Sequence, residues 1–111
     1  MNFKVFKLAK EKIAPIALGR GGCTATDRIV VDGCLVGYMY REPPVNEKDS
    51  GWRFFAGDED DVYMADSRHH GVFDVNTIAN YDPEILQFLD AEIGSRLERQ
   101  DIGSFKLLAP T

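Results

Sequence analysis

The chain has 111 residues, which is enough for one hydrophobic core and too few for two domains. Its hydrophobic content of 44% and charged content of 28% are typical of a folded globular protein, and it holds no apolar run of the roughly twenty residues that a membrane span needs. The net charge of −5 argues against direct binding to nucleic acid or to anionic membranes, because both need a basic surface. A basic protein partner fits this charge better; alternatively, the acidity only keeps the protein soluble.

The N-terminal part predicts little regular structure. Residues 2–8 alternate apolar and Lys positions, as in an edge strand. One helical turn can follow before Pro15, and residues 19–22 (GRGG) form a loop without the spacing of a phosphate-binding loop. Because residues 1–20 lack the features of a secretory signal, we expect a cytoplasmic protein.

A hairpin is predicted next. Asp32-Gly33 is a favoured two-residue turn, and strands over Arg28–Val31 and Cys34–Arg41 flank it. The second strand is apolar on both faces, which indicates a central strand covered on both sides. Gly37 within it marks a bulge or a close backbone approach.

After a polar loop, residues 51–57 (GWRFFAG) predict a further strand. Its alternation places Trp52 and Phe54 on one face and Arg53 and Phe55 on the other. Trp52 is predicted to lie in the core, since clustered aromatic residues mostly signal packing.

The acidic residues that follow predict a helix. Asp58 is a good N-cap for a short helix over residues 58–66, because carboxylates favour the positive end of a helix. A loop through the two histidines, a strand over residues 71–75 and one helical turn capped by Asn76 come next.

The C-terminal part predicts a second capped helix. Asp82 is its N-cap, Pro83 occupies the first helical position, and Gly94 ends it. Residues 95–98 (SRLE) have the form of a capping box for a last turn, and residues 104–108 predict a closing strand. Strands and short helices without regular alternation predict an α+β domain with a mainly antiparallel sheet.

The uninterrupted acids Asp58, Glu59, Asp60 and Asp61 follow directly after the aromatic strand. They lack the alternating ligand spacing of a calcium loop, and their expected exposure argues against a catalytic carboxylate pair. Helix capping accounts for two of the four. The excess points to a negative surface for a positive partner.

Other residues suggest no chemistry. His69 and His70 are neighbours, so in an extended chain their side chains point apart and cannot share a metal ion. Cys23 and Cys34 are expected to be reduced and part-buried, and no base lies near Cys34 in the sequence. We therefore predict no catalytic, cofactor-binding or metal-binding residues.

Three segments together resemble a known bacterial family: residues 21–44 (GGCTATDRIVVDGCLVGYMYREPP), 49–64 (DSGWRFFAGDEDDVYM) and 74–85 (DVNTIANYDPEI). The chain resembles immunity protein family thirty-three of the polymorphic toxin systems, most strongly over residues 21–99 of a single domain 1–111. The resemblance implies a non-enzymatic, cytoplasmic α+β domain that binds a cognate toxin and blocks its active site or its access to its target.

The acidic residues and the family resemblance together suggest a hypothesis about the contact surface. Residues 58–61, with Glu47 and Asp49, would form a negative face beside a rigid aromatic strand and imitate the phosphates of a toxin's substrate. Two alternatives remain open: a housekeeping module that binds a protein or a small ligand, and a metal-dependent enzyme built around the aromatic residues and the acids.

Overall fold

A computed structural model describes residues 4–100 and 104–108. Within these residues, six strands form one sheet in the order β4-β1-β3-β2-β5-β6. The strands are β1 (Gly22–Thr26), β2 (Tyr38–Arg41), β3 (Asp49–Phe55), β4 (His70–Asp74), β5 (Arg96–Arg99) and β6 (Phe105–Leu107). Every neighbouring pair is antiparallel except β1 and β3, which are parallel. The predicted α+β class with a mainly antiparallel sheet is confirmed.

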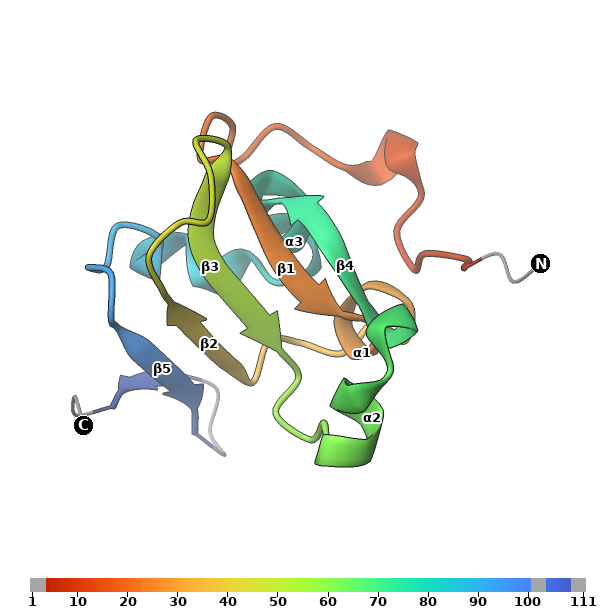
Figure 1. Ribbon diagram of the computed structural model, residues 1–111. Helices are drawn as coiled ribbons and strands as arrows, with labels where there is room; N and C mark the ends of the chain where they lie inside the picture. Colours follow the sequence, from red (N-terminus) through yellow and green to blue (C-terminus); the bar gives the residue numbers. More distant parts are fainter. Residues whose placement is uncertain (1–3, 101–103, 109–111) are drawn as a thin grey trace.

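Short helices cover one face of the sheet and leave the other face open. They are α1 (Asp27–Val30), α2 (Asp61–Ala65) and α3 (Val75–Tyr81), with the 3-10 helices η1 (Lys10–Lys12), η2 (Ser67–His69) and η3 (Pro83–Phe88). In Figure 1, α1 and α3 lie behind the sheet, whereas α2 lies beyond its lower end. The side of the sheet turned toward the viewer carries no helix among the described residues.

The hydrophobic core lies between the sheet and these helices. Its largest fully buried side chains include Met39, Trp52 and Phe54 from the strands and Ile29, Ile78 and Ile85 from the helices. Trp52 also donates a hydrogen bond from Nε1 to the carbonyl oxygen of Leu89, at 3.2 Å. The predicted place of Trp52 in the core is therefore confirmed.

Alternation along β3 decides which residues reach the open face. Trp52 and Phe54 point into the core, so Arg53 and Phe55 point the other way, as the sequence predicts. In the neighbouring strand, Tyr38 pairs with Phe55 and Tyr40 pairs with Arg53. All four of these side chains therefore share the open face. β2 lies inside the sheet between β3 and β5, as expected, but no described helix covers this face, so the predicted cover on both sides is wrong.

The predicted hairpin around Asp32-Gly33 is wrong. The residues before it form α1, whose Ile29 is fully buried. Gly33 has a φ of 81° and donates its N–H to the carbonyl oxygen of Ile29 at 3.0 Å, which ends the helix in the left-handed conformation. Both structures need a glycine with positive φ, so the dipeptide alone does not separate them. The chain then becomes a strand only at Tyr38.

Two other predicted elements near the chain ends differ. Residues 4–8 form no strand, and residues 2–3 of that prediction lie outside the described residues. Lys7 donates its N–H to the carbonyl oxygen of Val30 at 2.7 Å, so this segment is bound to α1 and not to the sheet. Residues 95–98, predicted as a helical turn, instead contribute to β5, because pairing with β2 supplies their backbone hydrogen bonds.

Of the helix caps predicted at Asn76 and Asp82, the second is confirmed and the first is wrong. Asp82 caps η3 by accepting the N–H of Glu84 at 3.2 Å, and Pro83 takes the first position, as expected. The cap of α3 is Asp74, not Asn76: the Asp74 carboxylate accepts the N–H of Asn76 at 2.8 Å. Asn76 is itself buried inside the first turn.

Both cysteines are free thiols, as expected. Cys23 is buried, which raises the pKa of its thiol, and Cys34 is half-buried. In the described part of the chain, no helix has the length and apolar character to cross a membrane.

Candidate functional site

Glu59 is the most firmly held residue of the acidic segment, which we define as Asp58 to Asp61. Its Oε2 accepts hydrogen bonds from Oγ1 of Thr26 at 2.5 Å and from the N–H of Ala56 at 2.8 Å. Its Oε1 accepts the N–H of Gly57 at 2.8 Å. Glu59 therefore ties the loop after β3 to the end of β1.

Asp58 is held by an ion pair with α1. Arg28 donates to the two Asp58 oxygens from Nε at 3.1 Å and from Nη2 at 2.6 Å, and its Nη1 reaches Asp32 at 2.9 Å. The Arg28 guanidinium lowers the pKa of the Asp58 carboxyl. Because these side chains are exposed, the pair fixes geometry more than it adds stability.

Asp60, not Asp58, is the N-cap of α2. Its Oδ1 accepts the N–H of Tyr63 at 2.7 Å, so the predicted cap lies two residues too early. The reason is the Glu59 network, which keeps the backbone in a turn through Gly57 and delays the helix.

Removing this cap should loosen α2 measurably. In Asp60→Ala, we expect amide hydrogen exchange at Tyr63 to become about fivefold faster, because an N-cap contributes about 1 kcal/mol. The matched control is Asp61→Ala, which removes a carboxylate from the first turn without removing the cap and should change the rate less than about twofold. An unchanged exchange rate at Tyr63 in Asp60→Ala would contradict the assignment of the cap.

Carboxylates of α1 and α2 gather at one end of the sheet. The effect of these charges is visible at Tyr63, which lies among them. Burial raises the pKa of its hydroxyl, and the charges of Asp27, Asp32 and Glu59 raise it further. We call this region the acidic end; its carboxylates are Asp27, Asp32, Asp58, Glu59, Asp60, Asp61 and Asp66, and its cations are Lys4, Arg28 and Arg68. The described carboxylates here outnumber the cations, so the local charge is negative.

The other two predicted contact residues lie elsewhere. Glu47 precedes β3 and Asp49 begins it, whereas the acidic segment follows the end of the same strand. A strand of this length spans roughly 20 Å. The six predicted carboxylates therefore form two separate groups, one at each end of β3.

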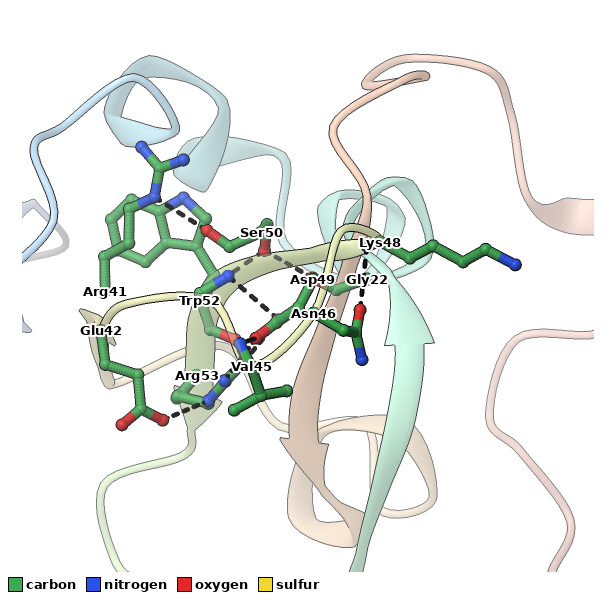
Figure 2. Close-up of polar contacts among 11 residues, drawn as sticks. Gly22, Arg41, Glu42, Val45, Asn46, Lys48, Asp49, Ser50, Trp52 and Arg53 are labelled. Atoms are coloured by element: carbon green, nitrogen blue, oxygen red, sulfur yellow. Dashed lines mark hydrogen bonds and ion pairs between the residues drawn. The ribbon is translucent and has the colours of Figure 1, made fainter.

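Asp49 takes part in a buried ion pair (Figure 2). Its carboxylate accepts from Nη1 and Nη2 of Arg53 at 3.0 and 2.8 Å, and also from the N–H groups of Val45 and Gly51. Arg53 in turn donates from Nε to Glu42 at 2.6 Å. The side chains of Arg53 and Asp49 are only 8% and 9% exposed, and the guanidinium holds the pKa of the Asp49 carboxyl well below its usual range.

The ion pairs of Arg53 with Asp49 and Glu42 were not predicted from the sequence. A signal for the pair with Asp49 was present, because residues four apart in a strand share a face, and Asp49 and Arg53 have that spacing within β3. The contribution of Glu42 follows only from the pairing of β2 with β3.

Beside this ion pair, three aromatic rings meet on the open face. The ring centroids of Tyr38, Tyr40 and Phe55 lie 5.8 to 5.9 Å apart, and Tyr40 stacks on Phe55 at an interplanar angle of 13°. All three side chains are half-buried. We call them the aromatic cluster.

A hollow of about 750 Å³ opens between the aromatic cluster and the acidic end. Its aromatic wall consists of Tyr38 and Phe55, and three carboxylates border it. These are Asp58, Glu59 and, from β5, Glu98. The hollow is thus lined by residues of both the aromatic strand and the acidic segment. The closeness of these two segments in the sequence was the main reason to predict a binding surface here.

The described carboxylates around the hollow do not form a metal site. Across residues 4–100 and 104–108, no group of three or more His, Cys, Asp or Glu side chains is arranged to hold a metal ion.

Comparison with known proteins identifies the family of the chain. The family model described as the immunity protein Imm33 domain matches residues 23–109, which is most of the chain. No curated protein and no solved structure matches the chain significantly. The resemblance seen in the sequence is confirmed, and the chain belongs to the Imm33 family of immunity proteins.

Proposed function

We propose that this protein binds a cognate protein toxin and neutralises it, acting by occlusion and not by catalysis. The observation that carries the proposal is the match to an immunity protein domain over residues 23–109. We further propose that the encounter takes place in the cytoplasm and that the toxin is basic.

The acidic end is the surface that we propose for the contact. It concentrates carboxylates in a chain whose net charge is already −5, and a negative surface attracts a positive partner and speeds their encounter. A toxin that acts on nucleic acid needs a basic cleft, and a carboxylate surface can occupy such a cleft in place of phosphates.

The acidic segment is also held in a fixed shape before any partner arrives. Glu59 is bonded to three groups of the domain, Asp58 to Arg28, and Asp60 to the first turn of α2. A pre-ordered surface loses less conformational entropy on binding than a flexible one. This supports a rigid inhibitor, and it leaves Asp61 as the residue whose charge can be changed with least effect on folding.

The first test is capture of the partner from the native host, with tagged protein, at low and then at moderate salt. We expect a single basic protein that is released as salt rises, because screening weakens exposed charge pairs. Expressed alone, the captured protein should arrest bacterial growth, and co-expression with the immunity protein should restore growth. Recovery of no specific protein, or of one that does not arrest growth, would contradict the proposal and favour a housekeeping or small-ligand role.

The contact surface is tested separately with charge reversal. We expect Asp61→Lys to weaken binding to the captured toxin about fivefold, as for loss and reversal of an exposed ion pair. The matched control is Glu92→Lys, which makes the same charge change at an exposed position away from the acidic end and should leave binding unchanged. Equal effects of both variants would show that only the net charge matters and would contradict a contact at the acidic end.

A further inference from the structure

We propose that the hollow beside the aromatic cluster receives an arginine side chain of the partner, so that it anchors the complex. This inference rests on the proposed function, because it assumes a protein partner that is basic. It adds a specific pocket and a specific side chain to that function.

The aromatic cluster is the first reason. Tyr38, Tyr40 and Phe55 stand on a sheet face that no described helix covers, and they remain half-buried there. Tyrosine and other aromatic side chains are enriched at the centres of protein interfaces, because they combine a large apolar surface with few rotatable bonds. A face built only to meet water would carry polar side chains at these positions.

The lining of the hollow decides which side chain fits. One wall is the aromatic pair Tyr38 and Phe55, and the border carries Asp58, Glu59 and Glu98. The lining also includes the cation Arg99, whose guanidinium is bound to Asp82 and Glu84, so the carboxylates of the border outnumber it. A guanidinium stacks on aromatic faces and forms forked hydrogen bonds to carboxylates. Arginine makes both contacts with one planar group, whereas a lysine ammonium neither stacks nor forms a forked pair.

The three carboxylates contribute in different ways. The Glu59 oxygens already accept hydrogen bonds from the domain, so Glu59 acts on a guest mainly through its charge. Glu98 is exposed on β5 directly across from Tyr38, where it can meet a guanidinium that lies on the ring.

The carboxylate half of this recognition already occurs within the chain, at the border of the hollow itself. Arg28 engages both oxygens of Asp58 with a planar fork at the acidic end. An incoming arginine on the other side of Asp58 would use the same chemistry. The volume of about 750 Å³ lies within the range of pockets that bind small organic groups.

The experiment is an NMR titration of the isotope-labelled full chain with N-acetyl-arginine methylamide. Its matched probe is N-acetyl-citrulline methylamide, which has nearly the same shape without the charge. We expect the arginine probe to shift the amide signals of Gly37, Tyr38 and Gly57, which line the hollow, with a dissociation constant on the order of 1 mM. The citrulline probe should produce no saturable shift.

Variants connect the response to the lining. Glu98→Gln and Tyr38→Leu should each weaken the arginine probe at least about threefold, while Glu47→Gln, the same carboxylate change at the other end of β3, should leave it unchanged. Signals away from the hollow report that each variant is folded. Equal shifts with both probes, shifts at another surface, or full affinity in Glu98→Gln would overturn the inference.

The same variants separate this inference from the proposed function. If the toxin is captured and Tyr38→Leu and Glu98→Gln bind it as tightly as the natural protein does, the pocket is wrong and the toxin-binding function stands. If the arginine probe binds in the hollow but the captured partner does not arrest growth, the pocket chemistry is supported and the toxin-binding function is wrong.

Discussion

Asp49→Asn is expected to lower the free energy of unfolding by about 3 kcal/mol. The substitution removes the charge that faces Arg53, whose side chain is 8% exposed. Among the described residues, Glu42, which is 44% exposed, is then the only carboxylate that pairs with the Arg53 guanidinium. A buried charge that loses its main partner is costly, because water cannot replace that partner. Urea denaturation at neutral pH measures the change.

The matched control is Glu47→Gln, which neutralises an exposed carboxylate of the same loop and should change stability by less than about 0.5 kcal/mol. If Asp49→Asn is as stable as the control, the buried pair does not stabilise the domain. A double-mutant cycle with Arg53→Met isolates the coupling between the two side chains.

The same pair predicts how stability depends on pH. The pKa of the Asp49 carboxyl is lowered in the folded protein, so the folded state holds the ionised form more strongly than the unfolded chain does. The stabilisation is complete above the ordinary carboxyl pKa of about 4 and is lost as the pH falls from there toward the lowered folded-state value. Denaturation curves should therefore show a smaller acid-induced loss in Asp49→Asn than in the natural protein.

Gly37→Ala is expected to destabilise the domain by about 3 kcal/mol, at the upper end of the range for overpacking. A Cβ at Gly37 would lie 1.9 Å from the carbonyl oxygen of Ala56, which confirms the predicted close backbone approach. The backbone cannot yield easily, because Gly37 donates its N–H to Phe55 and accepts from Arg99, each at 2.8 Å. Thermal and urea unfolding measure the loss.

Gly94→Ala is the control for this substitution. Gly94 has a φ of 100°, but a Cβ there would meet nothing within 4 Å. Only the backbone strain of a positive φ remains, which costs about 1 kcal/mol. A smaller effect at Gly37 than at Gly94 would contradict the steric explanation. Since Gly37 lines the hollow, Gly37→Ala should also shift the NMR signals of the aromatic cluster.

Local patterns in the sequence predicted the parts of this protein that depend on few neighbours. The alternation in residues 51–57 placed Trp52 in the core and Arg53 on the opposite face, because a strand has a period of two wherever it lies. Asp82 before Pro83 was a sufficient signal for a helix start, because both act within one turn. The order of the elements gave the fold class, and three segments together indicated the family.

The tertiary structure decided the secondary structure of segments whose local sequence is compatible with two alternatives. Asp32-Gly33 fits both a hairpin turn and a helix end, and only burial of Ile29 under the sheet selects the helix. Residues 95–98 fit a capping box, but β2 offers a complete row of hydrogen-bonding partners, so they pair as β5.

The acidic segment shows the same division most clearly. The sequence by itself determined that four carboxylates follow an aromatic strand, and that the chain belongs to the Imm33 family and carries a surplus of negative charge. Only the tertiary structure decided their separate tasks, with Glu59 bonded to Thr26, Asp58 to Arg28, and Asp60 capping α2. It also brought Glu98 to the hollow from a strand far along the chain. The physical reason is that a carboxylate takes its role from the donors around it, and those donors come from segments whose approach is set by packing of the whole core.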